Sequence, residues 1–113
     1  MKIARKTMSK EQFSLLIQSF IGDDKEIDEI FLRSTYGVSL KTMAACWNIC
    51  RFKEKGTRPE HMLWALHFLK TYNTEVRIAK SYYVTRKTFR KWLWPTLREI
   101  ARARHTLVSK IMY

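Results

Sequence analysis

The chain has 113 residues, of which 46% are hydrophobic, and it includes four Trp, five Tyr and six Phe, so it holds enough apolar material for the core of one domain. This composition excludes disorder throughout the chain. The formal net charge of +12 and the sequence pI of about 10.1 favour an anionic partner, with nucleic acid first and an anionic membrane surface second.

The positive charge is concentrated in the second half of the chain. Residues 1–56 hold ten Lys/Arg against seven Asp/Glu, whereas residues 57–113 hold twelve against three. No apolar run approaches the roughly 20 residues of a membrane span, and the first residues lack the apolar core of a signal peptide. We therefore expect no membrane partner and no export, and we place the anion-binding surface in residues 57–113.

Helices dominate the predicted fold, because only three Gly and two Pro interrupt the apolar periodicity. The expected class is all-α, a compact bundle of five to six helices with a C-terminal helix-turn-helix. In a first subdomain, residues 1–56, Ser9 caps a helix over about 10–21 through a capping box with Gln12. Asp23 or Asp24 caps a helix over about 24–34. Ser39 caps a third over about 40–52.

A second subdomain, residues 57–113, is predicted to follow the polar run 53–57. Thr57 caps a helix over about 58–72 with Pro59 in its first turn. Its buried side chains are expected to be Leu63, Leu66, Leu69 and Tyr72. Helices over about 75–81 and 86–104 complete the domain, capped by Thr74 and Thr85.

Pro95 lies inside the last predicted helix, where it removes a hydrogen bond and clashes with the preceding turn. The apolar positions nevertheless keep one phase on both sides of it, from Phe89 to Ile100. We therefore predict a kinked helix, or two nearly collinear ones, in place of a reversal.

A faint internal repeat relates residues 36–43 to residues 82–89, displaced by 46 positions. Each segment has an aromatic residue, a turn, Val, a hydroxyl cap and then a helix. Both a duplication and chance agreement from helix-capping chemistry account for the match.

The segment from Glu75 to Trp94 is typical of a helix-turn-helix whose second helix is rich in cations. Such a helix, apolar on one side and cationic on the other, suits a major groove flanked by phosphates. The candidate DNA-binding residues are those facing outward on this unit and its continuation: Arg86, Lys87, Arg90, Lys91, Thr85, Lys80, Arg77 and Arg98.

These candidates are expected to have different roles. Arg86, Lys87 and Arg90 reach base edges, and Lys91 holds the backbone. Thr85 caps the helix and offers a hydroxyl or amide to a phosphate. Trp94 shares their face, so it either stacks on a base or packs against another segment.

Metal and catalytic sites are not expected. Cys46 and Cys50 share a helix face, but His61 and His67 are six residues apart and point to different faces. No nucleophile elbow, phosphate-binding glycine loop or separated carboxylate pair is visible. We expect no cofactor, no metal, no small-molecule substrate and no enzymatic activity. Two cysteines without a disulfide framework suit a reducing, intracellular compartment.

Residues 58–75, RPEHMLWALHFLKTYNTE, followed by KTFRKW at 87–92, form a recognisable pattern. It resembles the N-terminal helical region of Harbinger-like DDE transposases, in particular the diatom and oomycete variants, in which RPxHLLWALxFLKxYxTE precedes KTFRKW. The upstream block FLRSTYGVS at 31–39 and Trp47 are similar as well. The resemblance covers roughly residues 25–112.

In that family a catalytic domain with a DDE carboxylate triad follows the helical region, and this chain has no counterpart of the triad. The resemblance implies the DNA-binding or assembly part of a transposase, as an excised domain, a truncated gene product or a domesticated remnant. It also implies a nuclear protein. A separate Myb-like protein can recognise the target in this superfamily, which would leave the helix-turn-helix for protein contact.

Two alternatives to duplex binding stay open. One is a protein-interaction or self-association scaffold that uses an aromatic surface around Trp64, Trp94 and Tyr113. The other is single-stranded nucleic-acid or RNA binding through stacked aromatic residues, although no RNA-module motif is present.

Overall fold

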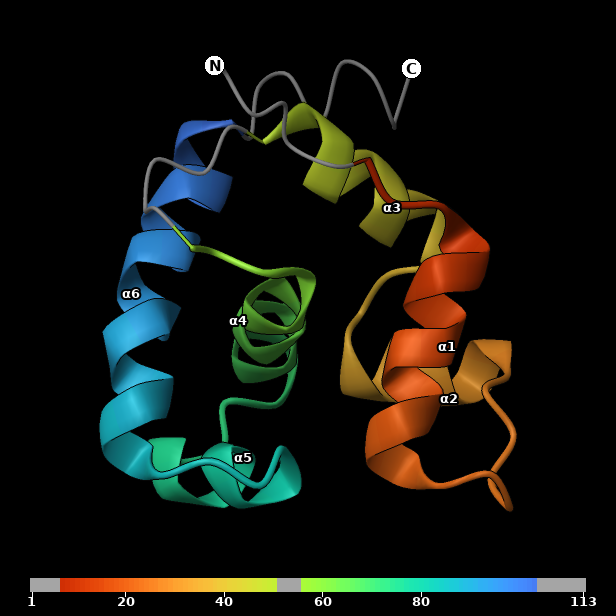
Figure 1. Cartoon of the computed structure of the whole chain (residues 1–113), viewed down its shortest axis with the longest axis horizontal. Helices are drawn as coiled ribbons and strands as arrows, with labels where there is room; N and C mark the ends of the chain where they lie inside the picture. Colours follow the sequence, from red (N-terminus) through yellow and green to blue (C-terminus); the bar gives the residue numbers. More distant parts are fainter. Residues whose placement is uncertain (1–6, 51–55, 104–113) are drawn as a thin grey trace.

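Six helices form the part of the chain that the computed structural model describes, residues 7–50 and 56–103 (Figure 1). These two ranges contain no strand, which confirms the all-α class. The helices are α1 (Lys10–Ile21), α2 (Glu29–Thr35), α3 (Leu40–Ile49), α4 (Pro59–Thr71), α5 (Glu75–Ser81) and α6 (Arg86–Arg102).

Hydroxyl caps set the start of four helices, as the sequence predicted. The side chains of Ser9, Ser39, Thr74 and Thr85 each accept the backbone N–H three residues further on. Gln12 completes the capping box of α1 by accepting the N–H of Ser9 at 2.8 Å.

The predicted start of the second helix at residue 24 is wrong. The cap is Asp28, whose carboxylate accepts the N–H of Phe31 at 2.8 Å, so α2 begins at Glu29. Residues before it form a link instead, because the Gln18 side-chain amide donates to the backbone carbonyls of Gly22 and Lys25. These hydrogen bonds hold the link across the end of α1.

Smaller corrections apply to three other helix ends. The cap position of α4 is Arg58 and not Thr57. α3 ends at Ile49 with Cys50 in an extended conformation, and residues 51 and 52 of the predicted helix lie outside the described residues. α6 ends at Arg102, and residue 104 lies outside them as well.

Pro95 lies within one continuous helix, α6, as the unbroken apolar phase indicated. The hydroxyl of Thr96, a fully buried residue, donates to the carbonyl of Trp92 at 2.7 Å. This bond ties the turn around Pro95 to the turn before it, where proline itself provides no N–H.

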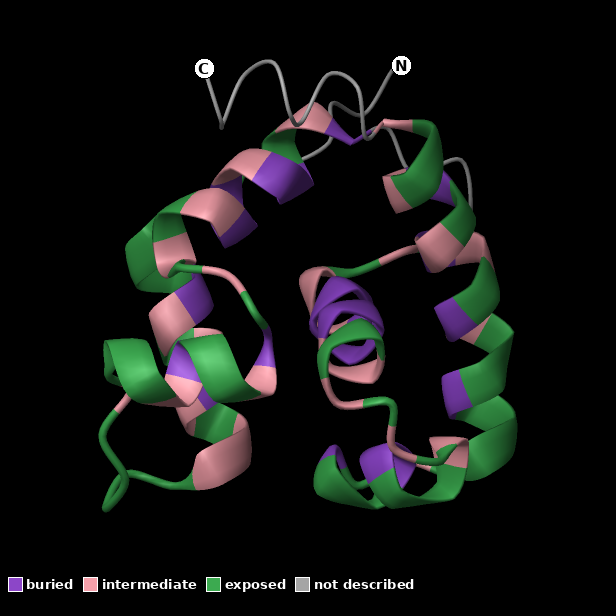
Figure 2. Ribbon diagram, turned by 180° about the vertical axis from the view of Figure 1, so that it is seen from behind, coloured by how far each residue is buried: buried purple, intermediate pink, exposed green. Residues whose placement is uncertain are grey.

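α4 lies at the centre of the molecule, and six consecutive residues, from His61 to Leu66, are buried (Figure 2). A helix buried on all sides over these turns must be covered by several neighbours. α6, α5 and α2 all pack on it. The prediction that Leu69 and Tyr72 are buried is wrong: they are 44% and 84% exposed. The C-terminal end of α4 leaves the core, and Tyr72 takes a left-handed conformation with φ of 55°.

The displacement of 46 residues noted in the sequence extends over two complete helix-turn-helix units. α2 and α5 have seven residues each, and Ser39 and Thr85 begin the following helices at equivalent positions. Each turn contains one residue with positive φ, Gly37 at 75° and Tyr83 at 59°. Helix caps alone do not account for this, because the buried positions repeat too. The buried pairs are Leu32/Ile78, Tyr36/Tyr82, Met43/Phe89, Trp47/Leu93 and Cys50/Thr96.

The described chain thus divides into two three-helix units, α1–α3 and α4–α6, which differ in one respect: α5 packs on both other helices of its unit, whereas α2 packs mainly on α4. α1 packs on α3 as α4 packs on α6. The predicted subdomain boundary at residues 56 and 57 falls between the units, and the division into subdomains stays a prediction.

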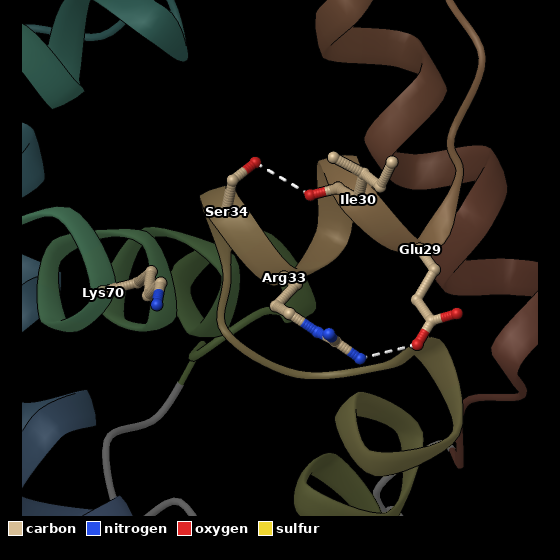
Figure 3. Close-up of a pocket in the computed structure, with 5 residues that line it drawn as sticks. All are labelled: Glu29, Ile30, Arg33, Ser34 and Lys70. Atoms are coloured by element: carbon tan, nitrogen blue, oxygen red, sulfur yellow. Dashed lines mark hydrogen bonds and ion pairs between the residues drawn. The ribbon is translucent and has the colours of Figure 1, made fainter.

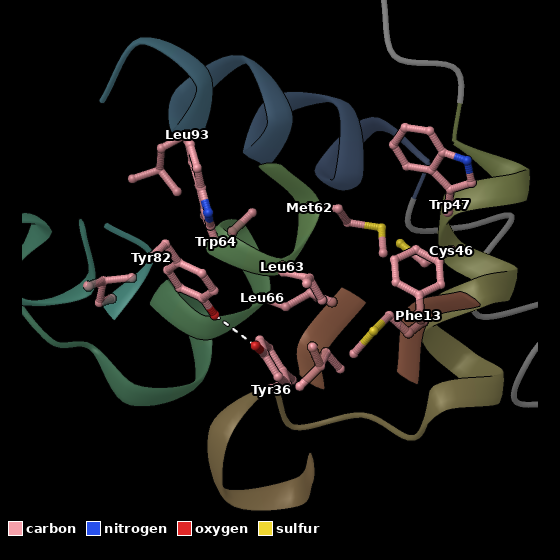
Figure 4. Close-up of a cluster of buried hydrophobic side chains, with 14 of the residues drawn as sticks. Phe13, Tyr36, Cys46, Trp47, Met62, Leu63, Trp64, Leu66, Tyr82 and Leu93 are labelled. Carbon is pink, nitrogen blue, oxygen red and sulfur yellow. Dashed lines mark hydrogen bonds between the residues drawn. The ribbon is translucent and has the colours of Figure 1, made fainter. Parts of the chain in front are cut away.

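A buried hydrogen-bonded chain joins the two units at equivalent tyrosines (Figure 4). The hydroxyl groups of Tyr36 and Tyr82 lie 2.8 Å apart, and Nδ1 of His67 lies 2.9 Å from the Tyr82 hydroxyl. Burial raises the pKa of Tyr36 to about 12 and also raises the pKa of Tyr82. Both tyrosines thus stay neutral and link the units through hydroxyl groups that have partners.

Replacing Tyr82 by Phe should destabilise the fold more than replacing Tyr36 by Phe. Y82F removes a partner from both the Tyr36 hydroxyl and His67, at a cost of about 1–3 kcal/mol. Y36F leaves the bond between Tyr82 and His67 and should cost about 1 kcal/mol. Urea unfolding of both variants and of the double variant tests this, and strictly additive losses would argue against a connected chain.

Replacing Tyr83 by Gly should stabilise the protein by about 0.5–1 kcal/mol. The side chain is 80% exposed, and its φ of 59° is costly for any residue with a Cβ. The equivalent position in the first unit already carries Gly37. The control is Y83A, which removes the ring but keeps the Cβ. Thermal unfolding should rank Y83G above the parent, and a Y83G midpoint no higher than that of Y83A would contradict the strain.

Candidate nucleic-acid interface

The inner face of α6 fixes the helix on the rest of the molecule. Phe89 and Leu93 are fully inaccessible to solvent, and the ring of Phe89 lies 5.5 Å from that of Trp64 on α4. α5 packs against both α4 and α6. The helix-turn-helix predicted between Glu75 and Trp94 is therefore present as two packed helices, α5 and α6.

His61 provides a second attachment between α4 and α6. Its ring stacks on Trp92 with a centroid distance of 4.4 Å and an interplanar angle of 10°. Its Nδ1 accepts the backbone N–H of Arg58 at 3.0 Å and so closes the first turn of α4. Burial, together with the charge of Arg58, lowers the pKa of His61 to about 4. The neutral ring thus serves as both a helix cap and a packing surface.

The outer face of α6 carries six exposed cations. These are Arg86, Lys87, Arg90, Lys91, Arg98 and Arg102. The same helix contains one acid, Glu99, which is buried and pairs with Arg102 at 3.2 Å. The four residues at the centre of the sequence prediction are thus exposed to solvent, where an external anion can reach them. We call these four, Arg86, Lys87, Arg90 and Lys91, the cationic ridge.

Two of these four cations also contact an acid. Arg86 Nη2 lies 3.5 Å from Oε1 of Glu75, and Arg90 Nε lies 3.6 Å from Oε2 of the same carboxylate. Both arginine side chains remain more than half exposed, at 57% and 60%. Partial pairing of this kind leaves most guanidinium N–H groups available. The sequence did not indicate this contact, because Glu75 precedes the arginines by 11 and 15 residues.

The two lysines of the ridge differ from the arginines. Among the described residues, neither Lys87 nor Lys91 has an acid within ion-pair distance. The ammonium group of Lys91 lies 5.2 Å from the centre of the Trp92 ring, within range of a cation–π interaction. Lys91 is therefore exposed, with its charged end next to the ring of Trp92.

The other predicted contact residues flank the ridge. Arg77 and Lys80 are exposed on α5, and Arg98 is exposed near the end of α6. The hydroxyl of Thr85 accepts the N–H of Thr88 at 3.2 Å and donates to its hydroxyl at 3.1 Å. That hydroxyl is committed to the cap.

The two helix-turn-helix units differ in charge, although their turns and several buried positions agree. Residues 75–95 contain six Lys/Arg and one Asp/Glu, whereas the equivalent residues 29–49 contain two and one. Shared architecture does not explain this difference. It makes the second helix-turn-helix the more cationic of the two.

Trp94 packs against another segment, which is one of the two roles that the sequence left open, and it stays partly exposed. Its ring packs edge-on against Phe68 of α4, with centroids 5.8 Å apart, yet the residue is 44% exposed. It lines a shallow surface depression together with Phe68, Asn73, Thr74, Glu75, Val76 and Arg86. One edge of the ring is thus anchored, while the rest is available to a partner.

The cysteines and histidines considered as metal ligands have other neighbours. The sulfur atoms of Cys46 and Cys50 lie 3.8 Å apart in the core, and His61 and His67 make the contacts described above. Within residues 7–50 and 56–103, no three His, Cys, Asp or Glu side chains gather as a metal site would require. His105 lies outside these residues.

Comparisons with protein families, with curated proteins and with solved structures gave no match for this chain. In the described ranges, no helix has the length and apolar character to cross a bilayer. The candidate interface therefore rests on its own geometry and charge.

The stability of the protein should fall as the pH is lowered from about 6.5 to about 4. His61 takes up a proton near pH 6.5 when unfolded but only near pH 4 when folded, so the folded state loses relative stability between these values. The loss attributable to His61 is at most about 3 kcal/mol.

The variant H61Q removes the titrating ring but keeps a hydrogen-bond acceptor for the cap N–H. Gln12, the third residue of α1, accepts the cap N–H in the same way. Urea unfolding at pH 7 and pH 4.5 should show a smaller pH dependence for H61Q than for the parent. Equal slopes for the two proteins would exclude His61 as the source.

Proposed function

We propose that this chain is a DNA-binding helix-turn-helix domain in which α6 is the recognition helix. One observation carries the proposal: a ridge of exposed cations lies on a helix whose opposite face is fixed in the core. A helix held in this way can enter a major groove as a rigid element, with its cations toward bases and phosphates.

The roles follow from position and pairing. Arg86, Lys87 and Arg90, in the first two turns of α6, contact base edges. Lys91 contacts the phosphate backbone. Support from flanking phosphate contacts comes from Arg77, Lys80 and Arg98 and from the backbone amide at Thr85.

This proposal agrees with the resemblance to the N-terminal part of Harbinger-like DDE transposases. It assigns duplex binding, and not catalysis, to the chain, with no metal or small-molecule substrate. A nuclear location follows from the same assignment.

The second candidate is a protein-interaction or oligomerisation scaffold of a transposase-derived protein. The exposed ring edge of Trp94 beside Val76, which is 46% exposed, favours it. The surface must differ from the one expected, because Trp64 is only 3% exposed and lies in the core. Tyr113 lies outside the described residues. Single-stranded nucleic-acid binding has no observation of its own to support it.

Duplex titrations at several salt concentrations test the proposal. If about five phosphates are neutralised, the logarithm of the affinity should fall against the logarithm of salt concentration with a slope near −4 to −5. K87A should weaken binding, whereas K41A should not, although Lys41 occupies the equivalent helix position in the first unit. R90A should relax sequence preference, and K91A should weaken all duplexes alike.

Three results would contradict these assignments. Salt-insensitive binding, or equal losses for K41A and K87A, would remove the ridge as the DNA-binding surface. A uniform loss for R90A would move Arg90 to the backbone contacts. Concentration-dependent mass without duplex binding at low salt would instead support the scaffold.

A further inference from the structure

We infer that Glu75 is a positioning residue that sets the sequence preference of the recognition helix by orienting Arg86 and Arg90. The inference rests on the proposed function, because it names a determinant of specificity within the same surface. Glu75 lies on α5, next to the cationic ridge but outside it, and its carboxylate contacts two of the ridge arginines.

The Glu75 carboxylate is held in place by the structure around it. Glu75 is the first residue of α5, immediately after the cap Thr74, and its side chain is only 16% exposed. One of its oxygens, Oε2, is buried and accepts no hydrogen bond from the described residues. Within the part of the chain that the structure describes, Arg86 and Arg90 are the cations that contact this carboxylate.

The contacts leave the base-reading groups of the arginines available. Arg86 and Arg90 lie one turn apart on α6, and each presents one edge to Glu75. Arg90 uses Nε, so both of its terminal nitrogens stay available for a bidentate contact with guanine. The separations of 3.5 and 3.6 Å exceed those of strong charge-assisted hydrogen bonds, so a base or phosphate can compete for the guanidinium groups.

Glu75 should also weaken the attraction between the cationic ridge and the DNA backbone, which does not depend on the DNA sequence. An acid beside the ridge weakens its pull on any phosphate backbone, whereas oriented arginines favour the duplex whose base edges they match. Removing the charge should therefore raise affinity for unrelated duplexes and lower discrimination.

The equivalent acid in the first unit provides a matched control. Glu29 is the first residue of α2, 46 positions before Glu75, and its carboxylate pairs with Arg33 of its own helix at 2.7 Å (Figure 3). Its side chain is 80% exposed. E29Q removes the same charge from the same helix position without touching the ridge.

The experiment compares the parent, E75Q and E29Q on two duplexes. One duplex is selected by the parent from a random pool, and the other is a scramble of it. E75Q should bind the scramble about threefold to tenfold more tightly, and its ratio of selected to scrambled affinity should fall about tenfold. E29Q should leave the ratio unchanged, and E75Q/R90A should lose no more discrimination than R90A.

A second readout does not need DNA. In ¹⁵N relaxation measurements, the Nε–H groups of Arg86 and Arg90 should be more mobile in E75Q than in the parent, and unaltered in E29Q. Equal mobility in all three proteins would overturn the inference while leaving the proposed function standing. So would equal discrimination by E75Q and the parent. Failure of the parent to bind any duplex would instead remove the proposed function, and the role assigned to Glu75 with it.

Discussion

Burial of α4 is the constraint on which the rest of the structure depends. Six consecutive residues of this helix, His61 to Leu66, are inaccessible or nearly so, and α2, α5 and α6 all pack against it. A helix covered on every side fixes the relative positions of its neighbours, because close-packed cores shift only at a cost. The outward direction of the α6 cations thus follows from contacts on the opposite side of that helix.

The two helix-turn-helix units show how one scaffold can carry different surfaces. Four of the five equivalent buried pairs hold different residues, such as Met43 and Phe89, while the caps and turns agree. Other equivalent positions differ in exposure as well: Ala44 of α3 is buried, whereas its equivalent, Arg90, is an exposed cation. α3 carries buried residues where α6 carries exposed charge. This difference is consistent with a first unit that supports the fold and a second unit that contacts the proposed partner.

Local chemistry made much of this fold predictable. Hydroxyl caps at Ser9, Ser39, Thr74 and Thr85 fixed four helix starts, since a cap needs only a side-chain oxygen and a free N–H nearby. The predicted start of α2 failed although its cap, Asp28, is also local, because the Gln18 side chain holds the residues after α1 in a link. The failed prediction that Leu69 and Tyr72 are buried depended on how other helices pack on α4.

The candidate site also has a part that local sequence predicts and a part that depends on contacts between distant residues. Exposure of the α6 cations followed from helical phase, which is local, so the sequence identified the ridge. The stack of His61 on Trp92 joins residues 31 positions apart and has no sequence signature. The approach of Glu75 to Arg86 and Arg90 depends on how tightly α5 turns into α6, and that angle is set by packing on α4.

Stability alone does not explain the contacts between Glu75 and the arginines. Ion pairs with more than half of one side chain exposed contribute at most about 1 kcal/mol and lose strength with salt. A mostly buried carboxylate also costs solvation, which long contacts of 3.5 and 3.6 Å recover only in part. An arrangement that adds so little to folding, yet places one carboxylate beside two guanidinium groups on an exposed helix, is better explained by the role proposed for those groups in binding a partner.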